Sequence, residues 1–138
     1  QSFHAVVGSR VLDTVEGLVE ARIRNARLFD EGLKGLESCI RPPRRPAGYR
    51  EVYQLYLVTA SRRDELVRFL VGRGVEAKIH YPIPIHLQNA ARDLGYKRGD
   101  FPVCERQANE VVTLPAHQHI TEDQIGYMVS VIHEFYGA

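Results

Sequence analysis

Apolar side chains recur at steps of three or four positions over residues 12–36, which is the spacing of one face of an α-helix. The members of this stripe are Leu12, Val15, Val19, Ile23, Ala26, Phe29, Leu33 and Leu36. A continuous helix of this kind would run about 40 Å at ~1.5 Å per residue, longer than a compact domain of this size needs. We therefore predict a long N-terminal helix, capped at Ser9 or Asp13, that outreaches its own domain and braces a neighbouring domain or subunit.

Composition limits the chain to one ordinary globular domain. Its 138 residues are 44% hydrophobic and 25% charged, and the formal net charge is only +1. This balance allows a buried core but lacks the strong field that would attract nucleic acid or an acidic membrane, so we expect neither partner. The two cysteines, Cys39 and Cys104, suit a reducing cytoplasm. Because the chain begins at Gln1 and its only methionine is Met128, we expect a piece of a longer protein.

Residues 41–50 separate the long helix from the rest of the chain. Four of these ten residues are arginine and three are proline. Proline fixes φ and removes a hydrogen-bond donor, so we expect an extended connector there rather than a helix or a central strand. We interpret its arginines as a solvated linker rather than a phosphate-binding patch, because they alternate with prolines and not with aromatic residues.

Helices and short strands alternate in the remainder, which predicts an α+β fold with helices layered on a small sheet. The expected strands are residues 52–60, 75–81 and 111–114. The expected helices are residues 61–72, 87–94, 102–109 and 121–135. Capping-box patterns mark the start of two of these helices, at Ser61 with Asp64 and at Thr121 with Gln124.

The densest polar cluster is the segment HYPIPIHLQ, residues 80–88. Its two prolines hold the backbone extended, so His80, Tyr81, His86 and Gln88 can project from a stiff ledge at fixed spacing. Imidazole and phenol groups offer hydrogen bonds that suit phosphate oxygens and sugar hydroxyls. The ledge is therefore a candidate binding site; the alternative is a rigid turn whose His80 and Tyr81 are merely packed.

Other reactive side chains carry weaker signals. His117 and His119, together with His80 and His86, supply enough imidazoles for zinc, but no cysteine or carboxylate stands at a ligand spacing, so we predict no metal site. We interpret Cys104 as a packed thiol, because apolar residues flank it in its predicted helix.

The ledge also carries a resemblance to a known family. HYPIPIHLQ and the following DLGYKRGDFPVCERQANEVVTLPAHQHITEDQ, residues 93–124, resemble the C-terminal part of the pyridoxal-phosphate-dependent nucleotide-sugar aminotransferases of the DegT/DnrJ type. Upstream, residues 52–58 and 63–82 match in order and length, and SRVLDT at residues 9–14 resembles the start of the family's long interdomain helix. The resemblance covers essentially the whole chain.

The resemblance implies the small C-terminal domain of a fold-type I aminotransferase, with a mostly antiparallel sheet covered by helices. Residues 1–36 would be the long interdomain helix and residues 37–138 the small domain. The complete enzyme would be a cytoplasmic homodimer that transfers an amino group from glutamate or glutamine to a nucleotide-linked keto-sugar through pyridoxal phosphate. Such chemistry needs a lysine that binds the cofactor aldehyde.

By family position, His80 and Tyr81 would contact the nucleotide-sugar, with His86 and Gln88 nearby. Ser9 and Arg10 would reach from the opposite subunit toward the cofactor phosphate. The family's catalytic lysine lies in a large N-terminal domain. None of the lysines of this chain, Lys34, Lys78 and Lys97, matches its motif.

We therefore expect no catalytic residue and no transaminase activity in this chain alone. A second hypothesis is a free-standing, non-catalytic α+β module that binds a partner subunit or a nucleotide-sugar. A third is a metal hydrolase built on the histidines.

Overall fold

The long N-terminal helix is confirmed in the computed structural model, which describes residues 2–137. α1 spans Ser2–Gly32. It starts before both predicted caps, so Ser9 and Asp13 lie inside the helix and the capping prediction was wrong. The reason is that no proline or turn between residues 2 and 8 interrupts the helical hydrogen bonds.

A small antiparallel sheet follows, as the α+β prediction requires. Its strands are β1 (Ile40–Arg41), β2 (Tyr56–Ala60) and β3 (Val111–Leu114), in the spatial order β1-β2-β3. Ile40 pairs with Ala60, and Tyr56 pairs with Leu114. The chain belongs to the α+β class with a three-stranded antiparallel sheet.

The strand predicted at residues 75–81 is reduced to a single bridge between Lys78 and Thr113. The backbone N–H of Ala77 bonds to the carbonyl of Val75 at 2.8 Å instead of to a neighbouring strand, which prevents a longer ladder. Val75 and Ala77 are still buried, as their alternation predicts.

The helices after the first strand are α2 (Arg63–Gly72), α3 (Pro102–Glu110) and α4 (Glu122–Tyr136), and two short 3₁₀ turns are η1 (Ile85–Leu87) and η2 (Asn89–Leu94). The capping box of Thr121 and Gln124 is confirmed at the start of α4. The Ser61 cap was wrong, because no side chain caps α2. The backbone of Ser61 instead bonds to the Cys39 carbonyl and to the Tyr136 hydroxyl, both at 2.7 Å.

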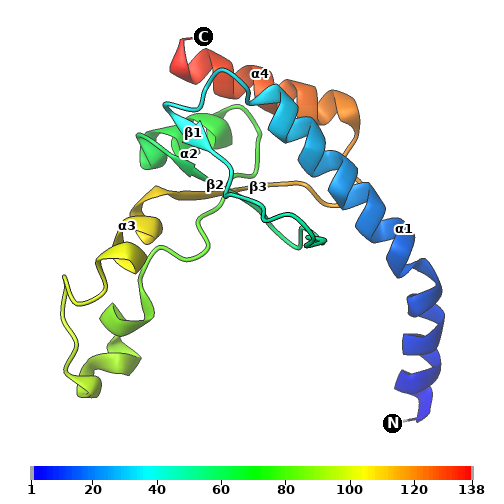
Figure 1. Cartoon of the computed structure of the whole chain (residues 1–138), viewed down its shortest axis with the longest axis horizontal. Coiled ribbons are helices and arrows are strands. Elements are labelled where there is room, and N and C mark those ends of the chain that lie inside the picture. The colour runs from blue at the N-terminus through cyan, green and yellow to red at the C-terminus, as the bar shows by residue number, and fades with distance from the viewer. Residues whose placement is uncertain (1, 138) are drawn as a thin grey trace.

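The core lies where the second half of α1, the sheet, α2 and α4 meet (Figure 1). Phe29 of α1 stacks on Tyr56 of β2, with ring centroids 4.9 Å apart. The largest fully buried apolar side chains are Phe29, Ile40, Tyr56, Leu66, Leu70, Leu114, Ile125 and Ile132. Because residues 23–36 belong to this same core, the division of the chain at residue 36 stays a prediction.

The first half of α1 leaves the body and points away from the other elements (Figure 1). Ile23 is buried, whereas Leu12 is 70% and Val15 38% exposed although they continue the same apolar stripe. The helix therefore does outreach its own core, as its length predicts. Within residues 2–137, no helix combines the length and apolarity needed to cross a bilayer.

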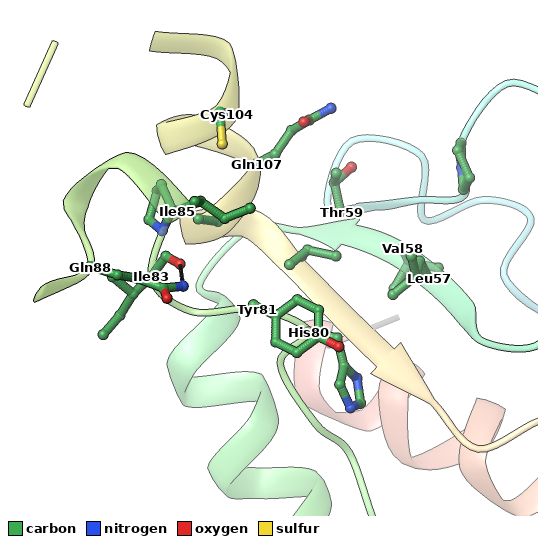
Figure 2. Close-up of a pocket in the computed structure, with 14 residues that line it drawn as sticks. Leu57, Val58, Thr59, His80, Tyr81, Ile83, Ile85, Gln88, Cys104 and Gln107 are labelled. Carbon is green, nitrogen blue, oxygen red and sulfur yellow. Dashed lines mark hydrogen bonds between the residues drawn. The ribbon is translucent and has the colours of Figure 1, made fainter. Parts of the chain in front are cut away.

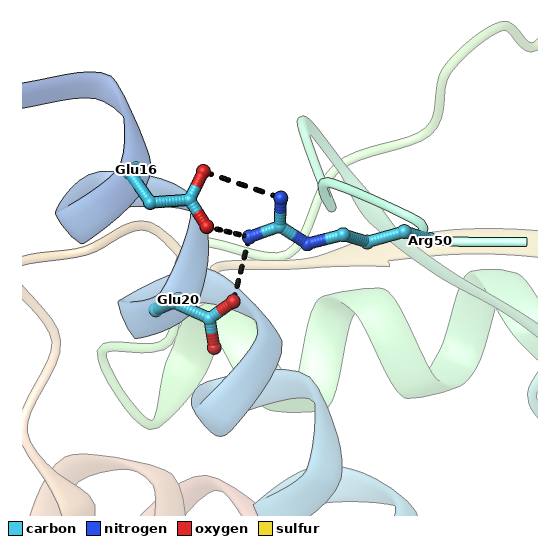
Figure 3. A network of polar contacts seen from close by, with 3 residues as sticks. All are labelled: Glu16, Glu20 and Arg50. Atoms are coloured by element: carbon cyan, nitrogen blue, oxygen red, sulfur yellow. Dashed lines mark hydrogen bonds and ion pairs between the residues drawn. The ribbon is translucent and has the colours of Figure 1, made fainter.

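The connector between β1 and β2 is fastened to α1. Arg50 contacts Glu16 and Glu20, one turn apart on the helix, with 2.6 Å to Glu20 (Figure 3). The hydrogen bond from Arg50 holds the pKa of Glu16 below its usual range. Further along the helix, Arg45 contacts Asp30, which also accepts a 2.7 Å hydrogen bond from the Tyr56 hydroxyl.

The solvated-linker interpretation was therefore wrong for Arg45 and Arg50. A carboxylate-rich face of α1, which lies 30 or more positions from Arg50 in the sequence, supplies partners for that guanidinium. This pairing depends on the fold and not on local composition.

Gly32 of α1 lies directly against Val129 of α4, and we predict that Gly32→Ala destabilises the chain by about 1–3 kcal/mol through overpacking. A Cβ at this position would lie 2.7 Å from a methyl group of Val129. Urea unfolding measures the free energy of unfolding. Because Val129→Ala makes room for the added methyl group, the double variant should lose less stability than the sum of the losses in the two single variants.

Gly17→Ala is the matched control, because a Cβ there meets nothing within 4 Å. It should raise stability by up to about 1 kcal/mol through helix propensity. Equal effects of the two glycine changes would contradict a tight helix crossing at Gly32.

Candidate functional site

A cavity of about 420 Å³ lies between the ledge of residues 80–88, strand β2 and helix α3 (Figure 2). Its lining is largely apolar, and a few polar side chains also line it. The lining residues are Pro43, Leu57, Val58, Thr59, His80, Tyr81, Ile83, Pro84, Ile85, Gln88, Cys104, Gln107, Ala108 and Val111.

His80 and Tyr81 both face this cavity, so the ledge is not packed into the interior. The Tyr81 side chain is 74% exposed, and its ring meets that of His80 edge-on, with centroids 5.7 Å apart. His80 is half-buried, and its Nδ1 lies 2.8 Å from the hydroxyl of Thr113. One of the two imidazole nitrogens of His80 is thus already hydrogen-bonded within the protein.

Gln88 also lies on the cavity wall (Figure 2). Its Nε2 donates a 3.1 Å hydrogen bond to the carbonyl of Ile83, which closes the ledge on itself. This bond fixes the amide orientation and leaves its carbonyl oxygen, among the described residues, free of a protein donor.

His86 does not line the cavity, although the sequence groups it with the other three. Its side chain is only 8% exposed, because it packs on Phe101 and its Nε2 lies 3.0 Å from Glu105. The structure therefore gives His86 a role in holding the ledge against α3.

Glu105 is a residue that sequence reasoning missed. The same oxygen that contacts His86 accepts the backbone N–H of Gly99 at 2.8 Å and of Phe101 at 3.4 Å. The Gly99 N–H chiefly holds the pKa of Glu105 below its usual range, and His86 adds to this against the opposing effect of burial. The signal in the sequence was an acidic residue in the first turn of a helix that starts with Phe101-Pro102.

The packed-thiol interpretation of Cys104 was wrong. The side chain is exposed and lines the cavity, because α3 buries only Ala108 and presents its other faces outward. Thr59 and Gln107 on the same wall were also missed, since nothing local in the sequence distinguishes them from surface residues.

A second hollow of about 260 Å³ adjoins the first, and His80 borders both. Its polar wall includes Gln54, Lys78 and Glu76. Lys78 and Glu76 form an ion pair at 2.6 Å. His80 is thus the one histidine of the ledge with space on two sides.

The lysines do not offer an anchor for a cofactor aldehyde. Lys34 is paired with Glu31 at 2.5 Å on the surface, Lys78 with Glu76, and Lys97 lies on an exposed turn. An imine-forming lysine must present an unpaired amine inside a shielded site, and none of these does. The residues described here do not fit covalent attachment of pyridoxal phosphate.

Ser9 and Arg10 are not brought to the cavity. They lie on the projecting half of α1, on the opposite side of the molecule from α3 (Figure 1). Arg10 is 3.9 Å from Asp13 and both side chains are well exposed.

His117 and His119 lie outside the ledge, near each other in the loop before α4. The rings of His117 and His119 lie 6.0 Å apart. Between residues 2 and 137, no three histidine, cysteine, aspartate or glutamate side chains converge in a way that could hold a metal ion.

The chain matches the model of the DegT/DnrJ/EryC1/StrS aminotransferase family over residues 1–133. It is 37% identical over 110 residues to a pleiotropic regulatory protein of Geobacillus stearothermophilus, covering 80% of this chain and 29% of that protein. It is 29% identical over 128 residues to the dTDP-3-amino-3,4,6-trideoxy-alpha-D-glucose transaminase of Micromonospora megalomicea, covering 91% of this chain and 34% of the relative.

Solved structures agree with this grouping. DesV of S. venezuelae superposes with a TM-score of 0.87 at 29% identity, over 92% of this chain and 34% of that one. A DegT DnrJ EryC1 StrS aminotransferase from Brucella abortus superposes with a TM-score of 0.81 at 32% identity, over 92% and 33%. The chain thus spans about a third of the length of its relatives.

Glu105 yields a prediction about acid. The pKa of Glu105 is lowered in the folded chain, so its ionised carboxylate stabilises the fold. This stabilisation is complete above the pKa of the unfolded state and is lost as the pH falls through the lower pKa of the folded state. We expect the Gly99 amide resonance in NMR spectra to shift in one acid step, and Glu105→Gln to abolish that step. Glu122→Gln, an exposed acid on α4, should leave it unchanged. A Gly99 resonance that ignores acid in the unaltered chain would contradict this role.

Proposed function

Because this chain belongs to the DegT/DnrJ/EryC1/StrS aminotransferase family, we propose that it forms the substrate-binding third of a nucleotide-sugar aminotransferase. The complete enzyme transfers an amino group from glutamate or glutamine to a nucleotide-linked keto-sugar. The nucleotide-sugar class is supported by relatives named as a dTDP-3-amino-3,4,6-trideoxy-alpha-D-glucose transaminase and a UDP-N-acetyl-3-dehydro-alpha-D-glucosamine 3-aminotransferase. The observation that carries the proposal is a rigid ledge whose polar groups line an open cavity.

The ledge supplies binding and orientation. The free imidazole nitrogen of His80 and the hydroxyl of Tyr81 can bond to phosphate or sugar oxygens as donors, whereas the Gln88 amide oxygen can accept a hydrogen bond from a sugar hydroxyl. The apolar cavity lining excludes water beneath the ligand, which strengthens these hydrogen bonds. Because two prolines stiffen the segment, little conformational entropy is lost on binding.

His86 and Glu105 do not contact the ligand in this proposal, and they affect its binding only by holding the ledge in position. Their 3.0 Å contact ties the far end of the segment to α3. A buried, hydrogen-bonded imidazole holds the backbone that presents Tyr81 and Gln88, so its contribution is to orientation rather than to direct contact.

Pyridoxal phosphate is the cofactor of the proposed enzyme, and when bound it supplies the electron sink for amino transfer. The anchoring lysine would come from polypeptide outside these residues, because Lys34, Lys78 and Lys97 are paired or exposed. Ser9 and Arg10 would approach the cofactor phosphate of an opposite subunit. Their exposure on a projecting helix supports that reach.

A homodimer is the assembly of the proposed enzyme. The exposed apolar residues Val11, Leu12 and Val15 on the projecting half of α1 support it, because such a stripe needs a covering surface. A reducing, cytoplasmic compartment suits the two free thiols, Cys39 and Cys104.

The second candidate is a free-standing module that binds a nucleotide-sugar or a partner subunit without catalysis. The absence of an unpaired, shielded lysine amine among the described residues favours it over catalysis by this chain alone.

The first test asks whether the chain anchors the cofactor. We expect that incubation with pyridoxal phosphate, followed by borohydride reduction, leaves no stoichiometric adduct on Lys34, Lys78 or Lys97 in a peptide mass map. A specific adduct on one lysine, lost on its replacement by arginine, would overturn the claim that the anchor lies elsewhere.

The second test asks whether the ledge binds the ligand. His80→Ala combined with Tyr81→Phe should weaken binding of dTDP-glucose or UDP-glucose by at least about tenfold, since each lost hydrogen bond is worth roughly 1 kcal/mol. NMR titration of the full chain measures the dissociation constant. His119→Ala combined with Tyr96→Phe is the matched control, because both residues lie away from the cavity. Unchanged affinity in the ledge variant would count against the site.

A further inference from the structure

Thr113 is the one polar residue in the strand Val111–Leu114, and it is only 6% exposed. Two other buried polar side chains, Asn25 and Arg63, each bond to backbone carbonyls and so join elements of the core. The Thr113 hydroxyl differs from them, because its partner in the described chain is a ring nitrogen of the ledge, Nδ1 of His80 at 2.8 Å.

The position of His80 relative to Thr113 is fixed twice. The backbones of Lys78 and Thr113 exchange both hydrogen bonds, at 2.8 and 3.1 Å, two residues before His80. The side-chain contact then sets the rotation of the imidazole ring. The Thr113 hydroxyl therefore bears on both the orientation of the His80 ring and the hydrogen bonding of its Nδ1 atom.

The number of protons available decides the direction of this hydrogen bond. A threonine hydroxyl has one proton to donate, whereas its oxygen can remain under-used as an acceptor at smaller cost. If the oxygen instead accepted a hydrogen bond from Nδ1–H, the hydroxyl proton would have no protein acceptor within residues 2–137. Donation to Nδ1 satisfies both groups, and the neutral ring then carries its proton on Nε2.

The Nε2 atom has no partner within residues 2–137, and the His80 ring borders both the 420 Å³ cavity and the 260 Å³ hollow. A ring held with its proton on Nε2 offers an N–H donor there. Such a donor selects an oxygen acceptor, which a nucleotide-sugar supplies as phosphate or sugar oxygens.

We propose that Thr113 is a positioning residue that holds His80 as the Nε2–H tautomer, so that the imidazole donates a hydrogen bond to an oxygen of the bound ligand. The ligand part of this inference rests on the proposed function, whereas the tautomer part does not. The two can therefore fail separately.

The tautomer is tested without any ligand. In two-bond ¹H–¹⁵N spectra of the full chain, at a pH where the ring is neutral, His80 should be protonated at Nε2. Thr113→Val removes the donor at nearly constant volume, and the Nδ1 resonance should then move toward that of a nitrogen without a hydrogen bond. Thr113→Ser restores the hydroxyl and should restore the resonance. A proton on Nδ1, or an Nδ1 resonance that Thr113→Val does not move, would overturn the proposal.

The donor role is tested by binding of dTDP-glucose. Thr113→Val should weaken the affinity about tenfold, the equivalent of about 1.4 kcal/mol, while Thr113→Ser stays within about twofold of the unaltered chain. In a His80→Ala background, Thr113→Val should have no further effect, because it acts through the ring. An equal loss in that background would show a purely structural role and overturn the proposal.

Inorganic diphosphate serves as a second probe and identifies the acceptor. If it shifts the Nε2 resonance of His80, the acceptor is a phosphate oxygen; if only dTDP-glucose does, the acceptor is an oxygen of the nucleoside or the sugar. If dTDP-glucose binds and neither compound moves this resonance, the donor role is wrong. If dTDP-glucose does not bind the unaltered chain, the proposed function fails, and the ligand-free spectra still decide the role of Thr113.

Discussion

The stacked contact between Phe29 of α1 and Tyr56 of β2 holds the long helix against the sheet. The two rings lie at 4.9 Å, both are fully buried, and the Tyr56 hydroxyl reaches Asp30 on the next helical position. Burial of two aromatic side chains gives this contact its strength, and the hydrogen bond gives it a direction. The course of the projecting helix and the placement of β2 under the cavity both follow from this contact.

Features with local causes could be predicted from the sequence. The 3.6-residue stripe marked α1, the pair Thr121 and Gln124 marked the start of α4, and Val111–Leu114 emerged as a strand with its predicted bounds. Each depends on residues a few positions apart, so the pattern and the structure report the same interaction.

The predictions that were wrong share a different physical cause, because contacts with residues distant in the sequence determine the structure at these positions. Ser61 does not cap α2, since its backbone is bonded to Cys39 and Tyr136 and Arg62 occupies the position before the helix. Arg50 is not a solvated linker residue, since α1 supplies carboxylates. In the candidate site, the ledge was visible as a polar, proline-stiffened segment. Its supports, Thr113 and Glu105, were not visible, because a buried hydroxyl and a helix-start acid look ordinary until the fold brings them to His80 and His86.

The Arg50 contact with Glu16 and Glu20 has a mechanical consequence for the projecting helix. A helix held only at its buried end can pivot about that end, whereas a second contact further along its length resists such a pivot. The connector supplies that second contact, and its other arginine, Arg45, returns to Asp30 beside the stacked rings. A sideways load on the free end of α1 is thus shared between the aromatic contact and the connector, and tilting of the helix must drag the edge of the sheet with it.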